Sequence, residues 1–258
     1  MKRAPFTSLI VLALLTTLVF EWACHRPTTN QPAEITVAAA SDLTQAFEEI
    51  GREFEASNKT KVVFVFGSTG MLTRQIENGA PMDLFAAANV DYVNQLEQKD
   101  LIIPGTKAIY ARGRITLWTT ADSPLKLETI TDLRRPEVKR IAIANPDHAP
   151  YGLAAQQALQ KAGLWDEVKP KLVYGDNIRQ TLQYAETGNV DVSIVALSLS
   201  QQSKGRWVLI PEELHQPIDQ GLAVIKTTRN EPAARAFANF IIGPRGKEIL
   251  AKYGFAFP

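Results

Sequence analysis

The sequence contains few of the residues that carry enzyme chemistry. It has one cysteine, Cys24, and three histidines among 258 residues. A single cysteine excludes an internal disulfide, and the widely spaced histidines match no metal-binding pattern such as H-E-x-x-H. No G-x-S-x-G turn is present, so the sequence offers no recognisable catalytic serine. We therefore predict a protein that is not an enzyme and that holds no metal or cofactor of its own.

The sequence also has almost no excess of positive over negative charge. The chain carries 28 basic and 27 acidic residues, and its densest basic stretch, 134–140, is short and interrupted. This near-neutral balance argues against a binder of nucleic acid or of membrane surfaces. The phosphate-binding patterns GxxxxGK[ST] and GxGxxG are missing, which argues against a nucleotide site.

The first residues are predicted to be an export signal. Lys2 and Arg3 precede an apolar stretch from Phe6 to Phe20. This stretch is shorter than the roughly 20 apolar residues that a membrane-spanning helix needs, but it suits a signal peptide. We assign residues 1–23 to this signal and expect the mature protein outside the cytoplasm, in the periplasm or at the cell exterior.

Cys24 follows directly and has two interpretations. A small residue before it, Ala23, fits cleavage and lipid attachment at Cys24, whereas Glu21 and Trp22 do not fit the usual apolar pattern. The alternative is an ordinary signal peptide with an incidental cysteine. Residues 24–33 are polar and contain proline, as in a flexible tether. Cleavage removes two basic residues and one acidic residue, which leaves 26 of each.

Strand-like and helix-like segments alternate along the rest of the chain, which predicts an α/β fold with mainly parallel sheets. Their rhythm suggests two lobes, with a ligand cleft between them where strands end and helices begin. We assign residues 34–110 and 221–258 to lobe 1 and residues 111–220 to lobe 2. Two crossings of the chain, near 111 and near 220, would form a hinge.

Four turns join a strand to a helix and carry the candidate site. The start of a helix offers unpaired N–H donors and a partial positive charge, and serine and threonine add donors without formal charge. The first two turns contain no lysine or arginine, which indicates a site for a small anion held by neutral donors. The four turns are Ser41-Asp42, Ser68-Thr69-Gly70, Ala149-Pro150-Tyr151 and Asp176-Asn177-Ile178.

Two alternatives stay open at this point. Serine, aspartate and asparagine before a helix are common caps that bind nothing. A site made only of donors prefers a fully deprotonated oxyanion, yet Asp42 could accept the proton of an anion such as hydrogen phosphate if it turned inward.

Five segments carry a recognisable pattern: Val37–Thr44, Phe66–Phe85, Asn145–Gly152, Gly175–Arg179 and Gly246–Phe255. In this order along the chain they resemble the motifs of molybdate-binding proteins of ABC importers. That resemblance implies the two-lobe (type II) periplasmic-binding-protein fold, a molybdate or tungstate ligand and a permease in the cytoplasmic membrane as partner. We also expect a monomer.

The resemblance also assigns roles to individual residues. Ser41 would give a hydroxyl to the anion, and Thr69 would give a second one, with its neighbour Ser68 as the rival. Tyr151 and Ile178 would direct backbone N–H groups at the anion from the second lobe.

One position departs from the family pattern. Many members carry a tyrosine whose hydroxyl reaches the anion, where this chain has Ala196. We expect the phenol of Tyr151 to replace it, although Tyr151 could simply pack at the start of its helix.

Three other functions remain as alternatives. The same fold could bind sulfate, phosphate or an organic anion. It could also be an enzyme, such as the deaminase of tetrapyrrole synthesis, although that enzyme holds its cofactor on a cysteine within the chain. An exported adhesion or scaffold module would have no buried site for a small ligand.

Overall fold

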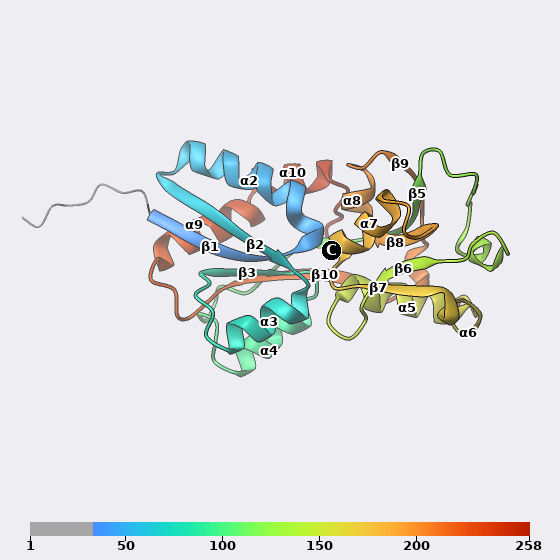
Figure 1. The fold of residues 1–258 in the computed structure, drawn as a ribbon. Coiled ribbons are helices and arrows are strands. Elements are labelled where there is room, and N and C mark those ends of the chain that lie inside the picture. Colours follow the sequence, from blue (N-terminus) through green and yellow to red (C-terminus); the bar gives the residue numbers. More distant parts are fainter. Residues whose placement is uncertain (1–32) are drawn as a thin grey trace, which may run out of the picture. The chain divides into compact units, whose positions relative to one another are not determined.

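The computed structural model describes residues 33–258. The predicted signal peptide, Cys24 and the tether up to residue 32 lie outside the described residues. Two sheets of five strands organise the described chain (Figure 1). The first sheet has the order β2 (Thr60–Gly67), β1 (Ala33–Ala40), β3 (Leu84–Ala87), β10 (Ile218–Val224) and β4 (Ala108–Gly113). The second has the order β7 (Leu172–Gly175), β6 (Ile141–Ala144), β8 (Val192–Ala196), β5 (Ile115–Thr120) and β9 (Gly205–Leu209).

Helices cover these sheets and complete two α/β lobes, as predicted. Those of the first lobe are α2 (Thr44–Ser57), α3 (Thr69–Glu77), α4 (Val90–Gln98), α9 (Glu231–Ile242) and α10 (Pro244–Lys252). Those of the second are α5 (Pro150–Lys161), α6 (Trp165–Val168), α7 (Ile178–Glu186) and α8 (Leu197–Ser200). Short 3-10 turns occur at η2 (Ser41–Leu43), η3 (Ile130–Arg134), η4 (Lys169–Lys171) and η5 (Glu212–Leu214).

Each sheet is mixed, and not mainly parallel as expected. In the first sheet, β1 pairs in parallel with β2 and β3, whereas β10 runs antiparallel to β3 and β4. In the second sheet, β6 pairs in parallel with β7 and β8, whereas β5 runs antiparallel to β8 and β9. All of these antiparallel pairs involve β5 or β10, the strands that follow the two chain crossings. At each crossing the chain passes from one sheet to the other without the covering helix that connects parallel strands.

The crossings lie close to the predicted hinge. Arg114 alone separates β4 of the first sheet from β5 of the second, and residues 210–217 lead back from β9 to β10. The predicted crossing points, near 111 and near 220, fall inside β4 and β10, which both belong to the first sheet. Their antiparallel pairing, Ile218 with Gly113 and Leu222 with Ala108, keeps the backbone in that sheet.

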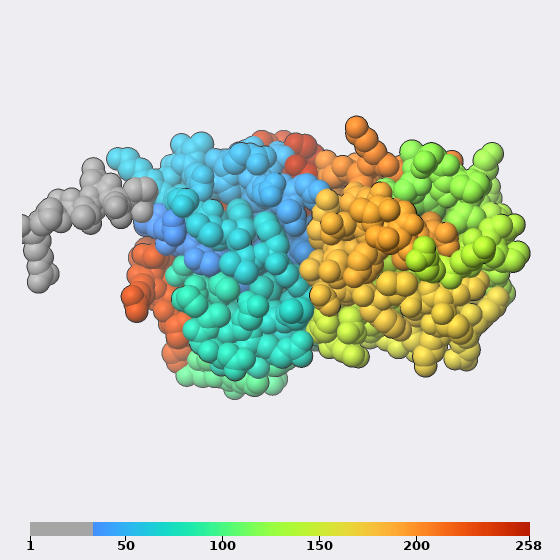
Figure 2. All heavy atoms as spheres, viewed as in Figure 1, coloured from blue at the N-terminus to red at the C-terminus, as the bar shows by residue number. Residues whose placement is uncertain are grey.

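From Val37 to Ala40, strand β1 is buried on both faces, which accounts for the run of apolar residues in this part of the strand. Val37 and Ala39 belong to the same buried cluster as Phe47 of α2, whereas Ala38 packs in the cluster of Leu72 in α3 and Leu96 in α4. In Figure 1, α2, α9 and α10 accordingly cover one face of the first sheet and α3 and α4 the other. The larger cluster continues into the second lobe, and on the face in Figure 2 atoms of the two lobes meet directly.

Candidate functional site

The first predicted turn ends strand β1 and opens the 3-10 helix η2. Ser41 is 4% exposed, and its hydroxyl oxygen has no hydrogen-bond partner among residues 33–258. A buried polar group without a partner costs free energy, and most such groups in folded proteins are satisfied by protein, water or ligand. The free hydroxyl of Ser41 therefore marks a position where a ligand that accepts a hydrogen bond would stabilise the protein.

The second predicted turn lies at the start of helix α3. Ser68 and Thr69 are both buried, and Ser68 precedes the helix without capping it through its side chain. The Thr69 hydroxyl accepts a hydrogen bond from the backbone N–H of Ala88 at 3.0 Å, which leaves its own hydrogen free to donate. This turn thus adds the hydroxyl donor of Thr69 to the unpaired N–H groups of the helix start.

The second turn also touches the opposite lobe. The Ser68 hydroxyl lies 2.9 Å from Nδ1 of His148, and the N–H of Gly70 donates to the carbonyl oxygen of His148 at 2.9 Å. A Cβ atom at position 70 would lie only 2.9 Å from that same oxygen. Glycine is therefore required for this approach of the two lobes, and the described structure is a closed form.

The second lobe contributes the starts of helices α5 and α7. Tyr151 is the second residue of α5, after Pro150, and Ile178 is the first residue of α7. Backbone N–H groups at these positions have no acceptor within their own helices. The cap of α7 does not use the N–H of Ile178, because the Asn177 side chain accepts from Gln180 at 3.0 Å instead. Both N–H groups are thus available to a ligand.

The four turns line a single small cavity, and the roughly 190 Å³ of empty space there includes part of the solvent at its opening. The structure brings all five predicted site residues together there: Ser41, Ser68, Thr69, Tyr151 and Ile178. The other lining residues are Ala40, Asp42, Gly67, Ala88, Ala149 and Pro150. Among these described lining residues Asp42 alone carries a carboxyl group, and no lysine or arginine is present.

Asp42 is the centre of a buried polar network that crosses the cleft. Its Oδ2 accepts hydrogen bonds from the Tyr151 hydroxyl at 2.9 Å and from Nε2 of Gln220 at 2.6 Å. Gln220 in turn accepts from the Tyr110 hydroxyl at 2.7 Å. The Ser198 hydroxyl donates to the backbone carbonyl of Asp42 at 2.8 Å. Lobe closure therefore encloses a carboxyl group surrounded by neutral donors.

Burial dominates the electrostatics of this carboxyl group. It raises the pKa of Asp42 from 3.8 to about 6, although the hydrogen bonds from Gln220 and Tyr151 act in the opposite direction. Burial also raises the pKa of Tyr110 and Tyr151 well above the usual value, so both phenols are neutral donors. The Oδ1 atom of Asp42 is buried and has no hydrogen-bond partner among the described residues.

The phenol of Tyr151, expected to reach the anion, is engaged elsewhere. Its hydrogen goes to Asp42, and its oxygen lies 3.0 Å from Nε2 of Gln220. Buried polar groups are stable when they are hydrogen-bonded, and the phenol is directed at Asp42 because it satisfies that buried carboxyl group. Ala196 is buried at the end of β8 and is not part of the cavity lining.

Three partners in the network were missed by the sequence analysis: Gln220, Tyr110 and Ser198. Gln220 is fully buried in strand β10, which is otherwise apolar except for Asp219, and a polar side chain at an inward position of such a strand is the signal that could have revealed it. Tyr110 gave no comparable signal, because a buried tyrosine in a strand is common.

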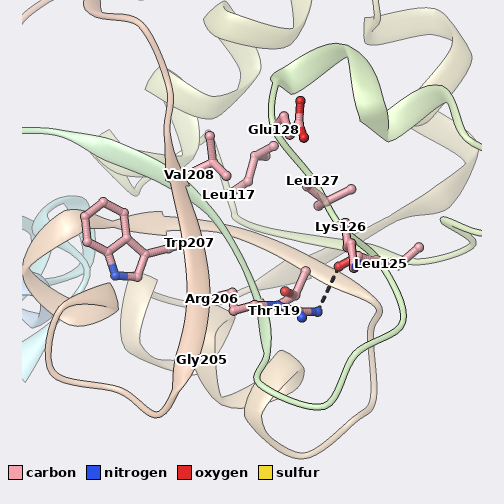
Figure 3. Close-up of a pocket in the computed structure, with 10 residues that line it drawn as sticks. All are labelled: Leu117, Thr119, Leu125, Lys126, Leu127, Glu128, Gly205, Arg206, Trp207 and Val208. Atoms are coloured by element: carbon pink, nitrogen blue, oxygen red, sulfur yellow. Dashed lines mark hydrogen bonds between the residues drawn. The ribbon is translucent and has the colours of Figure 1, made fainter.

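A larger hollow, of about 1000 Å³ and open to solvent, lies along edge strand β9 of the second lobe (Figure 3). It is formed by one lobe and includes none of the four turns. Arg206, its main cation, donates to the carbonyl oxygen of Leu125 at 3.0 Å. Within residues 33–258 we find neither a cluster of metal-ligating side chains nor a helix of the length and apolarity that crossing a membrane demands.

Comparisons with known proteins identify the family of the chain. Residues 35–256 match the model of the bacterial extracellular solute-binding protein family. The molybdate-binding protein ModA of Azotobacter vinelandii is 35% identical over 229 residues, which cover 87% of this chain and 90% of ModA. YvgL of Bacillus subtilis, provisionally named an ABC transporter substrate-binding lipoprotein, is 30% identical over 95% of this chain and 96% of its own.

The fold agrees with these similarities. The solved periplasmic molybdate-binding protein of Azotobacter vinelandii superimposes with a TM-score of 0.82 at 28% identity, covering 87% of this chain and 99% of that one. These relatives are named for the solute they bind, which agrees with the expectation of a binding protein and not an enzyme. The chain belongs to the bacterial extracellular solute-binding protein family and, within it, to the group of molybdate-binding proteins.

Proposed function

We propose that this protein captures molybdate or tungstate outside the cytoplasmic membrane and delivers it to the permease of an ABC importer. One observation carries the proposal: the closed cleft holds a small cavity lined by hydroxyl and N–H donors, without a lysine or arginine among its described lining residues. The molybdate-binding relatives from Azotobacter vinelandii support the choice of anion.

The chemistry of the cavity suits a small tetrahedral dianion. Ser41 and Thr69 would donate hydroxyl hydrogen bonds from the first lobe, with Ser68 beside them. Tyr151 and Ile178 would donate backbone N–H groups from the second lobe. Hydrogen bonds to a charged acceptor are stronger than those between neutral groups, and helix starts add favourable partial charge. The anion would thus be neutralised by dipoles spread over both lobes.

Closure of the lobes would link anion capture to delivery. The contacts of His148 with Ser68 and Gly70 hold the two lobes together beside the cavity. A permease could then distinguish the closed, loaded form from the open form by the relative position of the lobes. This role needs one molecule per captured anion, in line with the expected monomer.

Export and anchoring belong to the same proposal. The predicted signal peptide would place the mature chain outside the cytoplasm, and Cys24 would carry a lipid that holds it at the membrane. The lipoprotein name of the relative YvgL supports the anchor. Mass spectrometry of the protein from its native membrane tests it, because a lipid-modified N-terminal cysteine and an unmodified one differ in mass.

A thermal-shift panel tests the choice of anion. Molybdate and tungstate should each raise the melting temperature of the purified protein by several degrees, because a ligand that binds only the folded state stabilises it by mass action. Sulfate and phosphate at equal concentration should give a much smaller shift. Stabilisation by sulfate or phosphate but not by molybdate would overturn the assignment.

A further inference from the structure

One feature of the cavity is opposite to what a dianion site requires. Asp42 lines the cavity next to Ser41, is 1% exposed and is an acid without a lysine or arginine partner among the described residues. Its Oδ2 is occupied by Tyr151 and Gln220, whereas its Oδ1 is buried and unpartnered. A charged carboxylate here would face a bound dianion across a few ångströms of low-dielectric space.

The groups around Asp42 cannot compensate its charge. Tyr151 on α5, Tyr110 on β4 and Gln220 on β10 are neutral, and the segment of α8 carries no ionisable side chain. The charged side chains of these elements are engaged elsewhere: Arg112 of β4 pairs with Asp219 of β10, and Lys161, at the end of α5, donates to the carbonyl oxygen of Glu213. On the neighbouring helix α7, Arg179 pairs with Glu186. On α2, the first charged positions, Glu48 and Glu49, come only in its second turn. His148, the titratable side chain that contacts the second turn, is engaged with the Ser68 hydroxyl at 2.9 Å and has no hydrogen bond to Asp42 among those of the described residues.

Two like charges in such a cavity cannot both persist. When two acidic groups share a buried site, the ionisation of one raises the pKa of the other. Burial already raises the pKa of Asp42 to about 6 in the closed form without a ligand. A dianion entering beside Ser41 would raise it further, because the repulsion acts only on the charged form.

We propose that Asp42 takes up a proton when the oxyanion binds, and that the neutral carboxyl group then donates a hydrogen bond to the anion from Oδ1. The proton comes from solvent and forms an O–H bond at the oxygen that has no partner. Oδ2 continues to accept from Tyr151 and Gln220, so the network need not rearrange. This inference rests on the proposed function and adds that the captured unit is an anion together with one proton.

Proton uptake makes capture dependent on pH. Above the pKa of Asp42 in the free protein, each additional pH unit should weaken anion binding about tenfold, because the proton becomes ten times scarcer. Below that pKa the affinity should level off. Molybdate is a good probe because it stays a dianion over the neutral range, so its own protonation does not produce the effect.

Calorimetry of molybdate binding at about pH 7.5 tests the inference with the unaltered mature protein. The titration is repeated in buffers that differ in ionisation enthalpy, and the slope of the observed heat against that enthalpy gives the protons taken up. We expect about one proton per anion. Binding with fewer than about 0.2 protons would overturn the inference but leave the proposed function intact, whereas no binding would count against the function.

Two variants assign the proton to Asp42. Asp42→Asn should bind molybdate with no proton uptake and with an affinity that no longer depends on pH, while Asp166→Asn, which changes an exposed carboxylate on α6, should behave as the parent protein. Proton uptake that persists in Asp42→Asn would contradict the inference.

Tyr151→Phe tests the same carboxyl group through its partner. The hydrogen bond from Tyr151 lowers the pKa of Asp42, so its removal should raise that pKa. The molybdate affinity of this variant should therefore begin to fall at a higher pH than that of the parent protein.

Discussion

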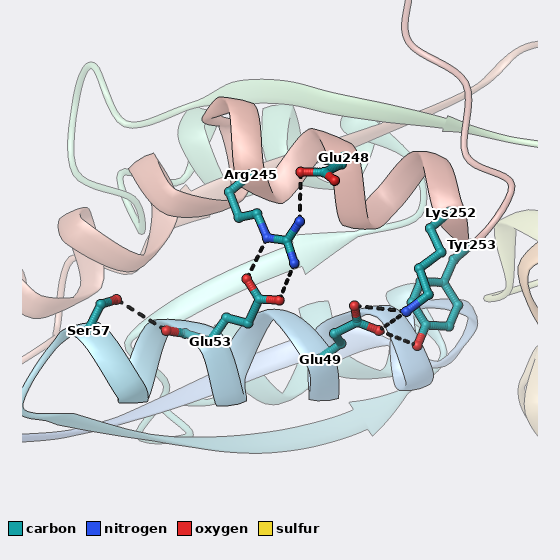
Figure 4. A network of polar contacts seen from close by, with 7 residues as sticks. All are labelled: Glu49, Glu53, Ser57, Arg245, Glu248, Lys252 and Tyr253. Atoms are coloured by element: carbon teal, nitrogen blue, oxygen red, sulfur yellow. Dashed lines mark hydrogen bonds and ion pairs between the residues drawn. The ribbon is translucent and has the colours of Figure 1, made fainter.

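Two polar clusters in this protein place similar groups in opposite surroundings. The cleft cluster consists of Asp42, Tyr110, Tyr151 and Gln220, which lie buried between the lobes without a cation. The helix cluster joins α2 to α10 on the surface of the first lobe (Figure 4). It consists of Glu49, Glu53, Arg245, Glu248, Lys252 and Tyr253.

In the helix cluster each carboxylate of α2 has a cationic partner. Arg245 donates to Glu53 at 2.6 Å, and Lys252 and Tyr253 both donate to Glu49, at 2.7 and 2.8 Å. These hydrogen bonds lower the pKa of Glu49 and Glu53, whereas burial raises that of Asp42. Pairing and burial therefore act in opposite directions on the same chemical group. A buried acid without a cationic partner in a cleft is a candidate functional group, and in this protein Asp42 is in that position.

The largest expected effect concerns the pH dependence of stability. Between the unfolded pKa of 3.8 and the folded pKa of about 6, the folded protein binds the proton of Asp42 more tightly than the unfolded chain does. Stability is therefore lost as pH rises through this window, by about 3 kcal/mol in total. Asp42→Asn should abolish this contribution. Urea denaturation of both proteins at about pH 4 and at about pH 7.5 measures it, and parallel profiles would contradict it.

Removing a partner of Asp42 should destabilise the protein nearly as much. Gln220→Leu removes the donor to Oδ2 and the acceptor of the Tyr110 hydroxyl, so two buried polar groups lose a partner. We expect a loss of about 2–3 kcal/mol in the free energy of unfolding. Gln183→Leu, on the exposed side of α7, is the matched control and should change stability little. Equal losses of stability in the two variants would contradict a stabilising role for the hydrogen bonds of the cleft cluster.

A smaller effect is expected from the unpartnered hydroxyl of the cavity. Ser41→Ala removes a donor that nothing in residues 33–258 accepts, so the unliganded protein should keep its stability. Molybdate affinity should fall by a factor of about 10–100, because hydrogen bonds to charged groups contribute about 1.5–3 kcal/mol. Calorimetry measures this, with Ser57→Ala on the exposed end of α2 as the control. An unchanged affinity would remove Ser41 from the site.

The sequence was sufficient to predict the turns that line the cavity. Local rules link strand, turn and helix start around Ser41 and Thr69, and helix starts carry unpaired donors whatever the tertiary structure. Their role in holding a ligand stays a prediction. The two lobes followed from the alternation of strands and helices. The crossing points came out a few residues away from Arg114 and from 210–217, because β4 and β10 continue their pairing past the predicted boundaries.

The cleft cluster could not be predicted in the same way. Asp42 and Gln220 are far apart in the sequence, and only the closed arrangement of lobes places Nε2 of Gln220 2.6 Å from Oδ2 of Asp42. The direction of the Tyr151 phenol depends on that same carboxyl group. Long-range polar contacts carry no periodic signal, whereas packing and capping do.

The smallest expected effect lies in the helix cluster. Arg245→Met removes the cation that bridges Glu53 and Glu248, yet these side chains are largely accessible to water. We expect the melting temperature to fall by less than about 2 °C, and by less still at about 1 M salt, because exposed ion pairs are weak and screened. Arg229→Met, at an exposed position without an ion pair among the described residues, controls for the loss of charge. If Arg245→Met lowered the melting temperature as much as Gln220→Leu does under the same conditions, ion pairing at the surface would stabilise this lobe as strongly as the buried network stabilises the cleft.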